Sequence, residues 1–413
     1  MYDITIFGAT GYTGSLCATY IASIFPTNTR WCITGRSETR LKALAKKLAV
    51  EYPDRVQPEI EIIPDLERES IDWLIEKTKV VINGAGPFHR LSTTVVEACA
   101  VLGTSYLDFS TETLWIKELI EKYEDVARAS GAILIPGISP SAPADVLAWL
   151  IAKEVRKKYK TCPTDIVATG KLDIKAMSPG SLTTVLDSLE TWGPAWYLSG
   201  DSSVLSNLKE PDTCRKPKAS FSSRLLGYRS VPGLGALTTS FIGPGNASVV
   251  HRSATQNPEL YGSSFHYQEY LPTTGVISAI FIHFFTKIGI ILLSIPLVRE
   301  LLRVLVDPSK PIQDQSKLQA TESAEYNAAG MIRQDMPVVR GQFLRRGPLY
   351  DFTALMTCVG ARILLEKIDN DGGKTDKTGG FLTPSSLGME YVDGLKEAGV
   401  SIEVEDLEHL ACQ

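Results

Sequence analysis

The first fourteen residues constrain the fold of this chain more than any other stretch, because a short strand-like run leads directly into three evenly spaced glycines. Residues 2–7 mix β-branched and aromatic side chains, a pattern that predicts a buried strand. Glycine allows a sharp turn and a close approach of backbone N–H groups to an anion, and the positive end of a following helix faces that anion. The stretch therefore predicts a dinucleotide-binding loop with the spacing G-x-x-G-x-x-G. The residues expected to contact the dinucleotide are Gly8, Thr10, Gly11, Tyr12, Thr13 and Gly14.

The end of the second predicted strand bears on which dinucleotide binds. Residues 12–25 predict a helix and residues 30–34 a strand, which completes a β-α-β unit. An acidic residue after this strand would bind the ribose 2′-hydroxyl of NAD, whereas an arginine accommodates the 2′-phosphate of NADP. The chain has Arg36 and Ser37 at this place, which favours NADP(H). The alternative is that Arg36 is a solvated loop charge and Ser37 the N-cap of the next helix.

Further strands alternate with helices up to about residue 160. Strand patterns at residues 59–63, 79–83, 105–109 and 132–135 predict an α/β fold with a doubly wound parallel sheet of the Rossmann type. Asp65 follows the third strand, where it would either lie near the adenine amino group or cap the short helix that follows.

The loop after the fourth strand is expected to cover the nicotinamide side of the cofactor. Strand four lies beside strand one across the topological switch point, and two glycines and a proline fix the backbone of this loop. His89 follows the loop and is a candidate proton donor; the alternative is a solvent-exposed histidine. The loop residues expected at the cofactor are Asn83, Gly84, Ala85, Gly86, Pro87 and Phe88.

Polar residues also follow the fifth and sixth strands. Tyr106, Asp108 and Glu112 are predicted to cluster at the carboxyl end of the sheet, where ligands bind in open α/β folds. Alternatively, Asp108 and Glu112 cap the helix that begins near Thr113. Tyr106 and Ser141 join His89 as candidate proton donors. No Tyr-x-x-x-Lys pair lies downstream, which disfavours ordinary ketoreductase chemistry.

The pattern changes beyond residue 162, where strand-like runs replace the βα alternation and predict a mainly antiparallel sheet with helices, an α+β domain. We expect an NADP(H)-binding Rossmann domain at residues 1–160, an inserted substrate domain at 161–349 and a C-terminal segment at 350–413 that packs back on the first domain. The sequence leaves homo-oligomerisation open.

Residues 276–298 form a long apolar run, VISAIFIHFFTKIGIILLSIPLV. The run is long enough to span a bilayer, but His283 and Lys287 lie at its middle, where a charge is costly. Three interpretations stay open: a transmembrane helix, a helix that lies peripherally on a membrane or lipid surface, and a buried helix or wall of an apolar substrate tunnel.

Composition excludes some classes of partner. The formal net charge of -5 argues against nucleic acid. The seven cysteines are scattered, with no metal-binding spacing, as a reducing compartment allows. Since the first strand begins at the N-terminus, no secretory signal fits before it. We expect a cytoplasmic protein, with association with a membrane or lipid-droplet surface as the open alternative.

Taken together, several motifs resemble those of the saccharopine dehydrogenase-like oxidoreductases, a family that includes trans-acting enoyl reductases. The motifs are GATGYTG, TGRS, NGAGPF, YLDFSTE and, near the end, GGFLTPSSLGMEYVDGL. The resemblance implies NADP(H) as cofactor and a Rossmann domain, to which a C-terminal segment returns around an inserted α+β domain.

Three functions remain in consideration. The leading hypothesis is an NADPH-dependent reductase of a small hydrophobic substrate with a conjugated C=C (enoyl) or C=O bond, such as a lipid, polyketide or terpenoid. The second is reduction of an imine, as saccharopine reductases perform, which calls for an arginine cluster that binds carboxylates. The third is a non-catalytic NADP(H)-binding sensor or lipid-surface protein. The arginines available for the second are dispersed: Arg215, Arg224, Arg229, Arg252 and Arg299.

Overall fold

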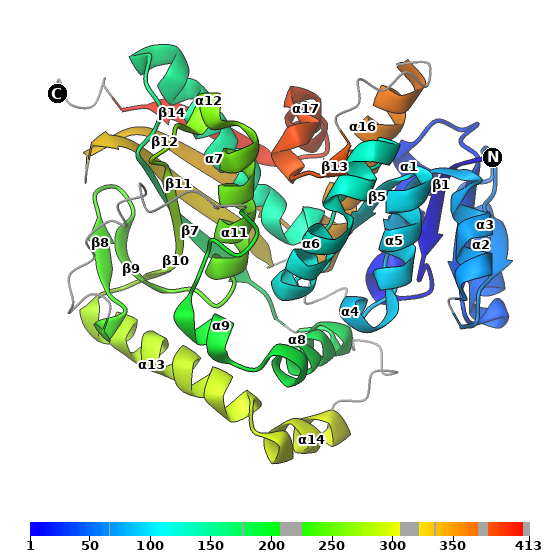
Figure 1. Ribbon diagram of the computed structural model, residues 1–413, viewed down its shortest axis with the longest axis horizontal. Helices are drawn as coiled ribbons and strands as arrows, with labels where there is room; N and C mark the ends of the chain where they lie inside the picture. The colour runs from blue at the N-terminus through cyan, green and yellow to red at the C-terminus, as the bar shows by residue number, and fades with distance from the viewer. Residues whose placement is uncertain are drawn as a thin grey trace. The chain divides into compact units, whose positions relative to one another are not determined.

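The computed structural model describes residues 1–65, 67–175, 177–206, 225–305, 322–333, 336–370 and 379–407 (Figure 1). The chain forms two compact units, each built from two segments. Unit 1 comprises Met1–Pro140 and Tyr350–Ala398, and unit 2 comprises Ser141–Leu349 and Gly399–Gln413.

Unit 1 contains a parallel seven-stranded sheet with the order β13-β6-β5-β4-β1-β2-β3. Six of these strands have the Rossmann order 3-2-1-4-5-6, so the predicted fold class of this part is confirmed. The strand order reverses between β1 and β4, which is where open α/β sheets bind their ligands. The strands are β1 (Tyr2–Phe7), β2 (Trp31–Gly35), β3 (Glu59–Ile62), β4 (Thr78–Asn83), β5 (Ser105–Asp108), β6 (Ile133–Ile135) and β13 (Gly380–Phe381).

The helices of unit 1 are amphipathic segments between these strands, joined by the end of the chain. Their apolar faces are buried, and α5 and α6 both end at a glycine with positive φ, Gly103 and Gly131. The helices are α1 (Tyr12–Ile24), α2 (Glu38–Glu51), α3 (Arg68–Ile75), α4 (Phe88–Leu91), α5 (Thr93–Leu102), α6 (Thr113–Ser130), α16 (Leu349–Asn370), the 3₁₀ helix η2 (Pro384–Leu387) and α17 (Met389–Glu397).

The C-terminal segment returns to the Rossmann sheet as expected. Strand β13 pairs in parallel with β6, and Cys358 of α16 donates from its Sγ to the carbonyl oxygen of Cys17 in α1, at 3.6 Å. Tyr20 donates to Asp351 at 2.8 Å. The two side-chain contacts join residues more than 300 positions apart, so the first domain is completed only when residues 350–398 have folded onto it.

Unit 2 contains a mixed sheet with the order β14-β12-β11-β7-β10-β9-β8, in which β7 and β10 are parallel and the other pairs antiparallel. The expected α+β, mainly antiparallel domain is therefore confirmed. Its strands are β7 (Asp165–Asp173), β8 (Arg229–Val231), β9 (Gly235–Thr239), β10 (His266–Thr273), β11 (Ser323–Arg333), β12 (Met336–Arg346) and β14 (Ser401–Asp406). The helices are α7 (Ile138–Tyr159), α8 (Pro179–Trp192), α9 (Ala195–Ser199), α11 (Gly243–Gln256), α12 (Pro258–Tyr261), α13 (Val276–Leu293) and α14 (Pro296–Leu305).

Two expected boundaries differ from the structure. Helix α7 was expected in the first domain, but from Ser141 onward it belongs to unit 2. The reason is close packing on the second sheet: Leu147 would lie 2.7 Å from a Cβ at Gly341, so only glycine leaves room for the helix. Strand β14 pairs with β12 in unit 2, so the C-terminal return ends at Ala398.

A buried carboxylate in unit 2 was not singled out from the sequence. Glu269 of β10 is only 6% exposed, and the side-chain amide of Asn246 in α11 donates to both of its carboxylate oxygens, at 2.9 and 3.0 Å. The Tyr267 hydroxyl donates to the same carboxylate at 3.2 Å. Burial raises the pKa of Glu269 to about 7, although the bonds from Asn246 and Tyr267 act in the opposite direction.

This raised pKa predicts a specific pH dependence of stability. Above the unfolded carboxyl pKa of ~4.3 and below about pH 7, the folded protein retains a proton that the unfolded chain has released. The free energy of unfolding therefore falls as pH rises through this window, by roughly 4 kcal/mol at ~1.4 kcal/mol per pKa unit. In Glu269→Gln this fall is absent, because glutamine keeps the hydrogen-bonding shape without titrating.

Urea unfolding of both proteins from pH 5 to pH 8 measures the difference. Glu403→Gln, which changes an exposed carboxylate in the same sheet, is the matched control and should keep the wild-type slope. An equal slope in wild type and Glu269→Gln would show that Glu269 does not hold the proton.

Candidate functional site

The glycine loop of unit 1 joins β1 to α1 and is shaped by contacts that only glycine permits. Gly8 has φ +67°, and a Cβ there would lie 2.7 Å from the carbonyl carbon of Gly84. A Cβ on Gly14 would collide with the carbonyl oxygen of Gly8. Gly11 is the N-cap of α1, and its N–H donates to the Gly8 carbonyl at 2.9 Å. The loop thus offers main chain and a helix N-terminus to a ligand, which fits a dinucleotide pyrophosphate.

Two basic residues follow β2, Arg36 in the turn before α2 and Arg40 in the first turn of that helix. Arg36 is exposed, and Ser37 caps α2 by accepting from the Arg40 N–H at 3.4 Å. The helix-capping interpretation of Ser37 is therefore correct. Arg40, which we had not predicted, donates from its guanidinium to the Thr10 carbonyl at 2.8 Å. The signal was available, because Arg40 lies one helical turn after Arg36.

Asn83 at the end of β4 begins a buried chain of hydrogen bonds. Its carboxamide oxygen accepts from the Ala85 N–H at 3.0 Å, and its NH₂ group donates to the Tyr106 hydroxyl at 2.9 Å. The Tyr106 hydroxyl donates in turn to Asp108 at 2.7 Å. The chain follows from the register of the sheet, in which Asn83 lies opposite Asp108. Asn83 therefore fixes the loop after β4 through its hydrogen bond with Ala85.

Asp108 ties together the loops after β5 and β6. One carboxylate oxygen accepts from the N–H and hydroxyl of Ser110, at 2.9 and 2.8 Å, and from the Gly137 N–H at 2.6 Å. Burial raises the pKa of Asp108, and these bonds and the one from Tyr106 partly offset that rise. The alternative in which Asp108 caps the helix at Thr113 is not what the structure shows.

Tyr106 was one of the candidate proton donors, but its position assigns it another role. The side chain is 0% exposed, and burial, followed by the Asp108 charge, raises its pKa well above the ordinary value. Its hydroxyl proton is directed at Asp108. Tyr106 thus acts as a positioning residue that links Asn83 to Asp108.

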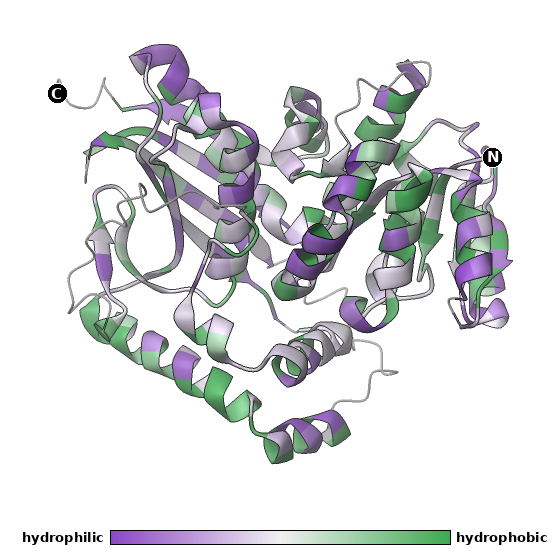
Figure 2. Cartoon of the chain, viewed as in Figure 1, coloured by the Kyte–Doolittle hydropathy of each residue, from purple (hydrophilic) through white to green (hydrophobic). Residues whose placement is uncertain are grey.

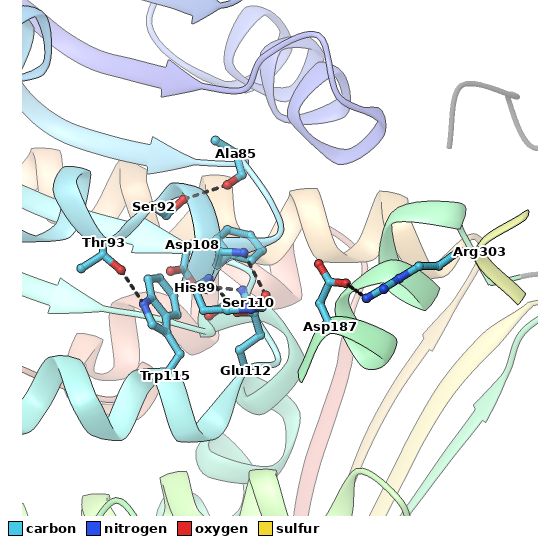
Figure 3. Close-up of polar contacts among 11 residues, drawn as sticks. Ala85, His89, Ser92, Thr93, Asp108, Ser110, Glu112, Trp115, Asp187 and Arg303 are labelled. Carbon is cyan, nitrogen blue, oxygen red and sulfur yellow. Dashed lines mark hydrogen bonds and ion pairs between the residues drawn. The ribbon is translucent and has the colours of Figure 1, made fainter. Parts of the chain in front are cut away.

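Glu112 and His89 form the other polar centre of unit 1. The Glu112 carboxylate, 1% exposed, accepts from the N–H groups of Phe88 and His89 at 2.9 and 2.7 Å, and it lies 2.7 Å from His89 Nδ1 (Figure 3). Glu112 therefore caps α4, whereas we had considered that it caps the helix at Thr113. The His89 side chain is 8% exposed, so it is not the solvent-exposed histidine of the alternative interpretation.

Aromatic packing holds the loop between Asn83 and His89. Phe88 packs edge-on to Phe109, with ring centroids 5.8 Å apart, and a Cβ at Gly84 would lie 2.9 Å from the Phe109 ring. The Ser92 hydroxyl donates to the Ala85 carbonyl at 2.8 Å (Figure 3). The ring of Phe88 is buried, so the residue supports the loop, whereas Gly86 is exposed.

The remaining predicted residues are placed as follows. Tyr12 and Thr13 are half-buried in the first turn of α1, and the Tyr12 ring lies edge-on to Tyr350 at 5.3 Å. Asp65 is exposed after β3, and Pro87 is the N-cap of α4. Ser141 is 4% exposed in α7, in unit 2. Arg215 and Arg224 lie outside the described residues. Within the described part of the chain, no group of three His, Cys, Asp or Glu side chains could hold a metal ion.

Comparisons with known proteins agree with this geometry. Residues 4–135, from β1 to β6, match the family model for the Saccharopine dehydrogenase NADP binding domain. The chain is 28% identical over 286 residues to the trans-acting enoyl reductase of Mycobacterium ulcerans (strain Agy99) and 27% identical over 284 residues to that of Mycobacterium tuberculosis (strain ATCC 25618 / H37Rv). Each match covers 65% of this chain and 65% of the length of the curated relative.

A likeness over nearly the whole chain comes from a solved structure, the apo saccharopine dehydrogenase (L-Glu forming) from Saccharomyces cerevisiae. The TM-score is 0.54 at 11% sequence identity, and the alignment covers 98% of this chain and 99% of that chain. At this identity the likeness shows the fold alone.

The fold, the glycine loop and the comparisons define an NADP(H)-binding domain of the Rossmann class. Residues 4–135 are similar to the Saccharopine dehydrogenase NADP binding domain, and the chain is similar in sequence to the trans-acting enoyl reductases. The predicted resemblance and the predicted cofactor, NADP(H), are thereby confirmed.

The placement of the basic residues predicts how cofactor preference is achieved. We expect Arg36→Ala to weaken NADPH binding about 10- to 100-fold, since a hydrogen bond to a charged group contributes ~1.5–3 kcal/mol. NADH binding should change little, because NADH lacks the 2′-phosphate. Arg40→Ala should weaken both, since Arg40 also holds Thr10. Fluorescence titration measures the four affinities, with Lys42→Ala on the exposed face of α2 as control. Equal losses for NADPH and NADH in Arg36→Ala would contradict the assignment.

The buried position of Glu112 predicts a structural cost when its charge is removed. Glu112→Gln places an NH₂ group against backbone N–H donors, so the protein should lose ~2–3 kcal/mol of unfolding free energy. Glu121→Gln in the same helix disrupts only an exposed pair with Lys117 and should cost less than ~0.5 kcal/mol. Urea denaturation of the two variants makes the comparison; similar losses would show that the Glu112 contacts contribute little.

Proposed function

We propose that this protein is an NADPH-dependent reductase of a hydrophobic substrate with a conjugated C=C (enoyl) or C=O bond, such as a lipid, polyketide or terpenoid. The observation that carries the proposal is the His89–Glu112 pair, which directly follows the loop expected over the nicotinamide in an NADP-binding domain. The name of the related mycobacterial proteins, trans-acting enoyl reductase, supports the enoyl substrate.

The residues of the chain divide the work of such a reaction. When bound, NADPH supplies the hydride. The glycine loop and the N-terminus of α1 hold the pyrophosphate, and Arg36 and Arg40 favour the phosphorylated ribose. The loop from Gly84 to Phe88 is held by Asn83, Ser92 and the buried Phe88 ring, so it forms a rigid wall. Rigid placement of the reacting groups is the main requirement of hydride transfer.

The reaction also needs one proton, and His89 is the side chain we assign to deliver it. Glu112 holds Nδ1 of the imidazole at 2.7 Å and, through the two backbone N–H groups, holds the helix turn that carries it. An imidazole oriented by a carboxylate is a common general acid, because its proton exchanges near neutral pH. Ser141 stays a predicted donor, whereas the fully buried Tyr106 supports the loop.

Imine reduction of a substrate with several carboxylates is less well supported by the described residues. Three of the five arginines considered for it are engaged in separate bonds within unit 2. Arg229 bonds to Gln268, Arg252 donates to the Leu205 carbonyl at 3.1 Å, and Arg299 donates to the Ser294 carbonyl. These side chains therefore do not form a common carboxylate-binding cluster.

The proposal predicts NADPH oxidation with some members of a panel of hydrophobic enals, enones and imines. His89→Gln should lower kcat by roughly 10²- to 10⁴-fold and leave NADPH affinity unchanged, since a general acid acts on the transition state. Arg90→Gln, an exposed neighbour in α4, is the control.

Loss of NADPH absorbance, together with a separate binding titration, distinguishes the outcomes. If the wild-type protein binds NADPH but oxidises it with no member of the panel, it is a non-catalytic binding protein. If His89→Gln keeps full kcat, another group delivers the proton.

A further inference from the structure

Helices α13 and α14 of unit 2 present a continuous set of exposed apolar side chains. In α13, Ile277, Phe281 and Phe285 are 87%, 70% and 70% exposed and recur every fourth residue, so they share one face. In α14, Leu297, Leu301 and Val304 follow at the same helical spacing. Figure 2 shows hydrophobic residues along much of both helices. Among the described residues, α13 is also the one helix long and apolar enough to cross a membrane.

The opposite face of α13 is fixed to unit 2 along its length. The Thr238 hydroxyl donates to the Ala279 carbonyl at 2.8 Å, and the Thr239 hydroxyl lies 2.7 Å from Nδ1 of His283. One turn later, the Lys287 ammonium donates to the Leu198 carbonyl. These attachments are four residues apart, so α13, ~27 Å long at ~1.5 Å per residue, lies against the unit from end to end. A helix held in this way cannot cross a bilayer while unit 2 stays folded.

The basic side chains of the two helices are turned toward the protein. Lys287 is bonded to Leu198, and Arg299 donates to the Ser294 carbonyl. The Arg303 guanidinium binds Asp187 at 2.6 Å (Figure 3) and also Glu190 and Glu300. Within residues 276–305 the basic side chains are thus hydrogen-bonded to protein groups, whereas Ile277, Phe281, Phe285 and Leu297 are exposed. The exposed face is complementary to an uncharged, apolar partner.

We propose that α13 and α14 form a docking surface for the phospholipid bilayer, on which they lie flat with the apolar side chains in the acyl boundary. A protein partner is less well matched, because protein interfaces surround an apolar centre with hydrogen-bonding groups. Amphipathic helices that rest in the interface insert ~5–10 Å, about the reach of these side chains. Because Lys287, Arg299 and Arg303 are bonded to groups of the protein, attachment depends on apolar contact and not on anionic lipid. This inference stands independently of the proposed reaction.

Flotation with lipid vesicles tests the proposal on the full chain. We expect the wild type to float with vesicles of phosphatidylcholine alone as well as with vesicles that also contain phosphatidylserine, and high salt should not release it. Phe281→Glu combined with Phe285→Glu and Leu297→Glu should lower the floated fraction at least tenfold. These positions are exposed, so circular dichroism and NADPH binding should match the wild type. Met336→Glu changes an exposed apolar residue of unit 2 outside these helices and is the matched control.

Several results would overturn the proposal. One is a wild type that stays with the soluble fraction for both vesicle types, and another is equal flotation of the triple variant. Flotation only with phosphatidylserine would assign binding to charge. A wild type that does not float but forms a dimer, which the triple variant converts to a monomer, would assign the surface to a second copy of this chain.

Discussion

The close approach of two backbones, at Gly8 and Gly84, is the constraint on which the nucleotide-binding unit depends. Strands β1 and β4 are parallel neighbours with Phe7 opposite Asn83, and the Gly84 N–H donates to the Phe7 carbonyl at 2.8 Å. A Cβ at Gly8 would meet Gly84, and one at Gly84 would meet the Phe109 ring. The place where the strand order reverses therefore presents main chain, which a pyrophosphate can approach closely.

Two buried carboxylates hold the loops at this end of the sheet in place. Asp108 accepts from backbone or side-chain donors after β5 and β6, and Glu112 accepts from the start of α4. Burying a carboxylate is costly unless its oxygens are fully hydrogen-bonded, and both of these groups meet that requirement. Ordering these loops costs conformational entropy, and the hydrogen bonds that the loops donate to each carboxylate offset that cost. In unit 1 the loops after β4, β5 and β6 are thus held by side chains that lie at the carboxyl end of the same sheet.

The sequence predicted the elements whose conformation depends on neighbouring residues in the chain. The glycine loop and the parallel strands follow from turn chemistry and alternation, so the Rossmann order and the cofactor side of the site could be predicted. The assignment of α7 could not, because it depends on the glycines at positions 330 and 341, nearly 200 residues away. Tyr106 had the chemistry of a proton donor, but its burial follows from sheet register. Glu269 was missed because its partner, Asn246, becomes a neighbour only in the folded chain.

The two units present chemically different surfaces, and this difference bears on how a reductase of water-insoluble molecules would obtain both reactants. Unit 1 exposes Arg36 beside the glycine loop, where an anionic, water-soluble cofactor is attracted from solution. Unit 2 exposes the apolar faces of α13 and α14, with their basic residues paired. A hydrophobic substrate partitions into the bilayer, so an enzyme docked there through apolar contact meets it at a far higher local concentration than in water. Because that contact involves no charge, docking would not compete with cofactor binding for anions.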